Sequence, residues 1–336
     1  PAPRPRWLDA AGSELGRPSL VMRREPGTCD YYVVNGDRPL PERVALARRF
    51  AAALLRLGLE PGEGVAIMSY NNPEWVIADV GAMMARGVPA GIYQTCTDEQ
   101  ALYIANHCRA RVLVVEDERL WERLDGPTLK PQLEHVRQIV MIRGAEKARD
   151  PDVMSFADFL ATGDGNEAAV EDALAAIEET DLGTLIYTSG TTGPPKGVML
   201  SHRNMAWTSQ AAIELVGGAG PDDTVVSYLP LSHIAEQMFS IHLPLSSGVP
   251  IWFAEDLTRL KDCLVVARPT LFLGVPRVWE KFRNALEAKL AEATGLKEKI
   301  VSLSRDALLE AGHIEILHGA DALSPVLKAK YALANK

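Results

Sequence analysis

The run YTSGTTGPPKG, from Tyr187 to Gly197, concentrates groups that can bind phosphate. Its serine and threonine hydroxyls donate hydrogen bonds, and its lysine adds the positive charge that a polyphosphate attracts. Its glycines let the backbone approach a ligand closely. The run therefore predicts a loop that holds nucleotide phosphates. The candidate binding residues are Thr188, Ser189, Gly190, Thr191, Thr192, Gly193, Lys196 and Gly197.

Two better-known phosphate motifs do not fit this run. A Walker loop requires glycine before its lysine and Ser or Thr after it, whereas Pro195 and Gly197 occupy those positions. A dinucleotide-binding fold is also unsupported, since no GxGxxG follows a strand. The alternative interpretation is a surface turn rich in glycine and threonine without a ligand. The density of hydrogen-bond donors in the run argues against it.

The composition is that of an ordinary globular protein. The 336 residues are 47% hydrophobic and 24% charged, and the length suggests about two domains or closely packed subdomains. The formal net charge of -9 argues against a nucleic-acid-binding face, which needs a basic patch. The four cysteines form no CxxC pair, which favours thiols in a reducing compartment.

The lengths of the apolar runs also bear on the cellular location of the protein. No run reaches the roughly 20 residues of a membrane span, and the first residues lack an apolar signal core. We therefore expect a cytoplasmic protein and leave peripheral membrane contact open.

The elements that position the loop follow from strand and helix signals that alternate along the chain. GVAIM (64–68), VPAGIY (88–93) and ARVLVVED (110–117) are apolar throughout, which is typical of buried parallel strands. The helix 73–86 begins after the cap Asn72, and Thr97 with Gln100 forms a capping box. This alternation predicts an α/β fold of mostly parallel sheets sandwiched by helices.

The domain boundaries follow changes in composition. Residues 1–40, rich in Pro, Gly and Arg, are predicted to form a surface arm. Residues 41–180 are predicted to form a first α/β subdomain, and residues 181–336 a second one that carries the phosphate loop. In the second subdomain, TLFLGVP (270–276) is predicted to be a strand, and the chain beyond Arg277 is predicted to be helical.

Several segments resemble one known family. LIYTSGTTGPPKGVMLSH (185–202) is similar to the signature of the adenylate-forming superfamily, which includes acyl-CoA synthetases, luciferases and the adenylation domains of peptide synthetases. YLPLSHIAEQ (228–237) resembles the next family motif, and NNPEWVIADVGAMMARGVPAGIYQT (71–95) resembles the family's early helix and strand. PTLFLGVPRVWEKF (269–282) is similar to long-chain fatty acyl-CoA synthetases of the bubblegum-type branch. The resemblance covers nearly the whole chain and implies the large N-terminal domain of this superfamily.

The resemblance implies a two-step ligase reaction. A fatty carboxylate attacks the α-phosphorus of ATP to give an acyl-adenylate, and coenzyme A then displaces AMP. It implies that Lys196 and His233 act in catalysis, that Thr188 contacts Mg²⁺, and that His233 faces the substrate carboxylate. As a lone side chain, His233 has a second interpretation as a structural core histidine. The acyl pocket is expected to involve His233, Gly274, Val275, Pro276, Arg277 and Trp279.

The family pattern is incomplete at the end of this sequence. The YGxTE-type motif, the ribose-binding aspartate, the hinge and the small mobile domain of the family are not found before Lys336. We therefore expect an N-terminal portion that, by itself, does not form thioesters. Two other functions stay open, namely loading of an acyl or aryl acid onto a carrier protein and non-catalytic nucleotide binding. The acyl length, the acceptor thiol and the oligomeric state also stay open.

Overall fold

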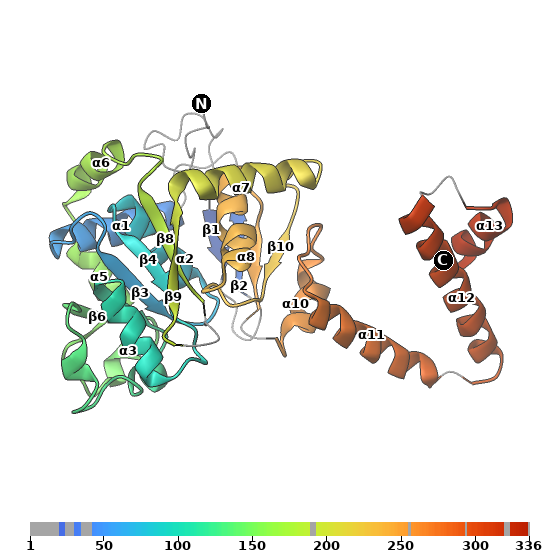
Figure 1. Ribbon diagram of the computed structural model, residues 1–336, viewed down its shortest axis with the longest axis horizontal. Coiled ribbons are helices and arrows are strands. Elements are labelled where there is room, and N and C mark those ends of the chain that lie inside the picture. The colour runs from blue at the N-terminus through green and yellow to red at the C-terminus, as the bar shows by residue number, and fades with distance from the viewer. Residues whose placement is uncertain are drawn as a thin grey trace. The chain divides into compact units, whose positions relative to one another are not determined.

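The computed structural model describes residues 20–23, 30–34, 42–188, 193–254, 257–292, 294–318 and 323–334. The chain divides into two compact units, residues 1–272 and 273–336, and each unit is described by itself (Figure 1).

A seven-stranded sheet forms the larger part of the first unit, in the order β7-β6-β5-β3-β4-β8-β9. All neighbouring strands run parallel except β8 and β9, which are antiparallel. The mostly parallel sheet predicted from the apolar runs is therefore confirmed. The strands are β3 Gly64–Met68, β4 Val88–Gly91, β5 Ala110–Val115, β6 Gln138–Met141, β7 Val153–Ser155, β8 Leu182–Thr188 and β9 Lys196–Ser201.

Helices cover both faces of this sheet. Along β3, Val65 and Ile67 join the apolar cluster formed with α1, α2 and α5, whereas Ala66 and Met68 join the cluster formed with α3 and α4. This alternation is the two-residue period of a strand with both faces buried. The helices are α1 Glu42–Arg56, α2 Pro73–Met84, α3 Asp98–His107, α4 Glu118–Trp121, α5 Phe156–Thr162 and α6 Glu167–Ala175, with 3₁₀ turns η2 Lys130–Gln132 and η3 Ala145–Lys147.

A second sheet of four strands, in the order β1-β2-β11-β10, completes the first unit. Strands β1 and β2 fall within the predicted arm, and β2 pairs antiparallel with β11. The other residues of that arm lie outside the described residues. The strands are β1 Leu20–Arg23, β2 Asp30–Val34, β10 Val225–Ser227 and β11 Ile251–Phe253; the helices are α7 His202–Leu215, α8 Ile234–Gln237, the π-helix η4 Met238–His242, α9 Leu243–Ser247 and α10 Leu260–Ala267.

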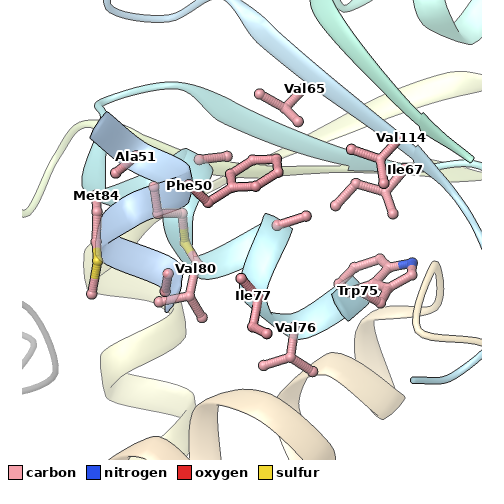
Figure 2. Close-up of a cluster of buried hydrophobic side chains, with 14 of the residues drawn as sticks. Phe50, Ala51, Val65, Ile67, Trp75, Val76, Ile77, Val80, Met84 and Val114 are labelled. Carbon is pink, nitrogen blue, oxygen red and sulfur yellow. The ribbon is translucent and has the colours of Figure 1, made fainter. Parts of the chain in front are cut away.

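Helix α2 connects the two parts of the first unit because it is buried on almost every side. Eleven of its twelve residues are buried. Apolar residues of α1, β3 and β5 share one cluster with α2, and so do apolar residues of β10, η4, α9 and β11. Figure 2 shows Phe50 of α1 near Val65, and Trp75 and Ile77 of α2 in the same cluster.

Local signals in the sequence were mostly reliable. Asn72 caps α2 by accepting a hydrogen bond from the N–H of Trp75 at 2.8 Å, and the capping box of Thr97 and Gln100 is present at α3. The strand predicted over residues 270–276 is wrong. Only Leu271 of the described segment forms a bridge, to Val225, and Pro276 already begins a helix. A short apolar run does not by itself distinguish a strand from an extended loop.

The predicted subdomain boundary between residues 180 and 181 stays a prediction. Strands β8 and β9, which follow it, hydrogen-bond into the same sheet as β3 to β7, through the β4–β8 pair.

The second unit is helical, as predicted from Arg277 onward. It contains α11 Pro276–Ala291, α12 Leu296–His318 and α13 Pro325–Ala334. Helices α12 and α13 pack around Ala311, Leu323 and Leu327. Within the described ranges, every helix is too short or too polar to cross a membrane.

Asp79 of α2 gives a prediction about stability. It is fully buried, and neither carboxyl oxygen has a hydrogen-bond partner among the described residues. Burial raises the pKa of Asp79 from 3.8 to about 8. Because the folded pKa exceeds the unfolded one, Asp79 disfavours the folded state increasingly as the pH rises from about 4 to 8.

We expect Asp79→Asn to raise the free energy of unfolding by ~2 kcal/mol or more at pH 8, and by much less at pH 5. Urea unfolding at both pH values measures the difference. The exposed Asp172 of α6 provides the control, since Asp172→Asn should change neither value. An equal gain for Asp79→Asn at both pH values would contradict the prediction.

Candidate functional site

The stem of the predicted phosphate loop is the antiparallel pair β8–β9. Strand β8 ends at Thr188, β9 begins at Lys196, and these two residues lie directly opposite each other. Opposite residues of an antiparallel pair project their side chains to the same face. Both side chains are exposed. The structure thus brings together the predicted metal-contact hydroxyl and the predicted phosphate-binding lysine.

The loop between these residues is partly described. Ser189, Gly190, Thr191 and Thr192 lie outside the described residues. Gly193 has a φ of 104°, in the left-handed region that glycine adopts without strain.

Tyr187 supports this stem from the side opposite Thr188 and Lys196. It pairs with Gly197, and a Cβ atom on Gly197 would lie 3.3 Å from Cζ of the Tyr187 ring. The Tyr187 hydroxyl lies 2.8 Å from Nδ1 of His107 at the end of α3, and the His107 ring stacks on Tyr103 at 5.2 Å. Burial raises the pKa of Tyr187 above its usual range. Helix α3 therefore fixes the ring on which Gly197 rests.

His233 lies just before α8 and acts as its N-cap. Its Nδ1 accepts a hydrogen bond from the N–H of Ala235 at 3.1 Å. Since Nδ1 accepts, the neutral ring carries its proton on Nε2. The side chain is exposed, so the interpretation as a core histidine is wrong. The capping bond fixes the ring and leaves Nε2 for another partner.

The loop that precedes His233 packs directly against the end of β4. A Cβ atom on Gly91 would lie 2.7 Å from Cα of Ser232 and 3.2 Å from Cζ2 of Trp75, so no side chain fits there. Strand β4 pairs in parallel with β8, and the carboxyl ends of parallel strands lie at the same edge of a sheet. His233 therefore lies at the edge that carries Thr188, as open α/β folds place their ligand sites.

Glu236 is a residue of this site that the sequence reasoning missed. Its buried carboxylate accepts hydrogen bonds from the N–H groups of Tyr228 and Leu229, both at 3.2 Å, and from Oγ of Ser240 at 2.6 Å. Burial raises the pKa of Glu236 to about 7, and these hydrogen bonds oppose the rise. The sequence signal for Glu236 was an acidic residue among the apolar residues that follow LPLSH, since a buried carboxylate needs hydrogen-bond donors around it.

The predicted acyl-pocket residues other than His233 gather at the start of α11, in the second unit. Trp279 donates from Nε1 to the carbonyl oxygen of Gly274 at 2.8 Å, and a side chain on Gly274 would overlap the indole. Val275 is the N-cap and Pro276 the first residue of α11. Arg277 and Trp279 are exposed. His233 belongs to the first unit.

A depression of about 780 Å³ lies elsewhere, around β6 and β7. Lys130, Arg137 and Asp152 are among the residues that line it. These strands form the opposite end of the seven-stranded sheet from β8 and β9, so the depression is separate from the phosphate loop. Among the described residues, no group of three or more His, Cys, Asp or Glu side chains could hold a metal ion.

Comparisons with known proteins agree with the resemblance seen in the sequence. The family model described as AMP-binding enzyme matches residues 42–335. Long-chain-fatty-acid–CoA ligase ACSBG2 of Xenopus laevis is 37% identical over 294 residues, which cover 85% of this chain and 39% of the relative. The human ACSBG2 is 38% identical over 265 residues, covering 77% and 39%. The chain thus spans about two fifths of the length of these relatives.

Solved structures show the same fold. A long-chain-fatty-acid-CoA ligase, FadD1 from Archaeoglobus fulgidus, superimposes with a TM-score of 0.63 at 23% identity, covering 86% of this chain and 55% of that one. ATP-bound MatB from Rhodopseudomonas palustris gives a TM-score of 0.61 at 21% identity, covering 83% and 51%. The predicted bubblegum-type resemblance and the predicted fold are both confirmed.

The contact between His107 and Tyr187 can be tested by a double-mutant cycle. We expect Tyr187→Phe and His107→Ala each to lower the free energy of unfolding by about 1 kcal/mol, because each leaves the other polar group without its partner. The double variant should lose about 1 kcal/mol less than the sum, as measured by urea unfolding.

Tyr70→Phe is the control, because the Tyr70 hydroxyl bonds Arg119 rather than His107. Its effect should add to that of Tyr187→Phe. Additive losses in the His107–Tyr187 cycle would show that the hydrogen bond contributes nothing to the stem.

Proposed function

Because this chain belongs to the AMP-binding enzyme family, we propose that it supplies the phosphate-binding part of an enzyme that activates a fatty acid with ATP. In the first step the carboxylate oxygen attacks the α-phosphorus of ATP and pyrophosphate leaves. In the second step the thiol sulfur of coenzyme A attacks the acyl carbon and AMP leaves.

One observation carries this proposal: the β8–β9 stem and the His233 loop lie at the same edge of the seven-stranded sheet. Lys196 and the Thr188 hydroxyl provide donors for the triphosphate at that edge, and His233 provides an imidazole for the carboxylate or the α-phosphate. Phosphoryl and nucleotidyl transfer depend chiefly on such positioned donors and charges.

The roles follow from the exposed groups. Lys196 would neutralise the developing charge of the departing pyrophosphate, and Thr188 would position a phosphate oxygen. Mg²⁺ is a typical partner of ATP and would be held by the phosphates and the Thr188 hydroxyl, where it would supply further neutralisation. The Thr188 hydroxyl is exposed opposite Lys196, so it is available for that arrangement.

A long-chain fatty acid is the proposed substrate. The support is the name of the relatives that match at 37% and 38% identity, which are long-chain-fatty-acid–CoA ligases. Coenzyme A as the acceptor, cytoplasmic location and peripheral membrane contact also stay proposals.

The discriminating experiment is ATP–pyrophosphate exchange with a panel of acids, using the protein in the form in which cells produce it. Exchange with long-chain fatty acids, followed by thioester formation with coenzyme A, is the expected result. Transfer only to a holo-carrier protein would favour carrier loading instead. ATP binding without exchange for any acid would overturn the proposal in favour of a nucleotide-binding protein.

We expect Lys196→Ala to reduce the rate of pyrophosphate exchange at least ~10-fold with little change in the melting temperature, because its side chain is exposed. Lys147→Ala is the matched control, since Lys147 is also exposed but follows β6, away from the stem. Equal exchange rates in the wild type and the Lys196 variant would refute the assigned role.

His233 has a capping role and a proposed catalytic role, and two substitutions separate them. Asparagine is a good N-cap residue, so His233→Asn should keep the stability that His233→Ala loses, about 1 kcal/mol. Both variants should lose exchange activity to a similar extent, since neither carries an imidazole. Retained activity in His233→Asn would limit His233 to its structural role.

A further inference from the structure

Asn71 joins the end of β3 to the loop that carries His233. Its Nδ2 donates to the carbonyl oxygen of Leu229 at 2.6 Å and to Oγ of Ser227 at 2.9 Å. Its Oδ1 accepts from the N–H of Leu231 at 3.1 Å. The side chain thus makes three hydrogen bonds to residues more than 150 positions away in the sequence. An amide is the side chain that can both donate and accept in this way.

These contacts join the two sheets of the first unit. Asn71 follows β3 of the seven-stranded sheet, whereas Ser227 ends β10 of the four-stranded sheet. Asn71 is buried, with 8% of its surface exposed, so its bonds are protected from competition with water. The other side of the same loop is held by Glu236, which accepts from Tyr228 and Leu229.

Among the described residues, Glu236 holds the His233 loop from the loop's own side, and Asn71 links the loop to the segment that follows β3. Glu236 lies on α8, so it moves together with His233. Asn71 follows β3, which is a strand of the sheet that also bears Thr188 and Lys196. The close packing of Ser232 on Gly91 limits how near the loop can come, and Asn71 limits how far it can move away.

We propose that Asn71 is a positioning residue that sets His233 relative to the phosphate loop. This inference rests on the proposed function. Asn71 does not touch the stem of the loop in the described contacts, so its loss leaves the binding of the triphosphate intact. The alignment of the carboxylate with the α-phosphorus depends on both sheets. The loss of Asn71 should therefore lower the rate of adenylate formation rather than the affinity for ATP.

The test compares Asn71→Ala and Asn71→Asp with the wild type in the protein as cells produce it. In pyrophosphate exchange we expect kcat to fall about 100-fold, because small displacements of reacting groups cost about that much. KM for ATP should stay within about twofold of the wild type. Asn71→Asp keeps the size of the side chain but loses both donated hydrogen bonds, so similar falls in kcat for the two variants would assign the loss to those bonds rather than to the missing volume.

Asn106 provides a matched control for stability. It too donates from Nδ2 to a carbonyl oxygen, that of Gln132, and accepts at Oδ1, from the N–H of Glu134. These contacts lie away from the His233 loop, so Asn106→Ala should lower stability without changing kcat. An equal fall in kcat for the Asn106 and Asn71 variants, or a rise in KM for ATP that accounts for the loss, would overturn the proposal.

A measurement independent of activity completes the test. Hydrogen exchange at the amides of Ala235, Glu236 and Gln237 should accelerate in the Asn71 variants, while the amides of β8 stay protected. Unchanged exchange at these three amides would overturn the proposal even if no acid is activated. A wild type that activates no acid but shows the expected exchange pattern in its variants would overturn the proposed function alone.

Discussion

The burial of α2 on almost every side is the constraint on which the first unit depends. A helix in which eleven of twelve residues are buried must be covered by other elements on almost all its faces. α1 and the seven-stranded sheet pack against it, and apolar residues of β10, η4, α9 and β11 belong to the same apolar cluster. The two sheets are thus held around one helix. Asn71 and Gly91, which lie before and after that helix, are thereby brought against the loop at residues 227–233.

Close steric packing and hydrogen bonds together fix that loop. At Gly91 the backbones approach so closely that even a methyl group is excluded, which is a steric limit. At Asn71 and Glu236, buried polar groups bond backbone atoms of the loop. A buried carboxylate is costly unless it is hydrogen-bonded, and the donors around Glu236 compensate for that cost. The result is a rigid position for His233, whose Nδ1 is in turn fixed by the N–H of Ala235.

The sequence predicted features that depend on neighbouring residues. The strand 64–68, the cap Asn72 and the box at Thr97 are local, because each requires residues only a few positions apart. The strand expected at 270–276 failed for the same reason. An apolar run reports burial, whereas a strand needs a partner, and only Leu271 finds one among the described residues. The pairing of β2 with β11 depends on residues about 220 positions apart, so no local signal could predict it.

The candidate site likewise combines features that depend on neighbouring residues with features that depend on distant ones. The pairing of Thr188 with Lys196 could be anticipated locally, because the two residues lie close in the sequence on either side of one loop. The binding of phosphate by that loop stays a proposal. The position of His233 could not be predicted, because it depends on contacts with Asn71 and Gly91. Nothing in the neighbouring sequence marks these two residues as partners of the His233 loop. A local motif can thus indicate which ligand to propose for a site. The alignment of reacting groups arises from contacts between distant segments, and those contacts are where substitutions should change catalysis without changing binding.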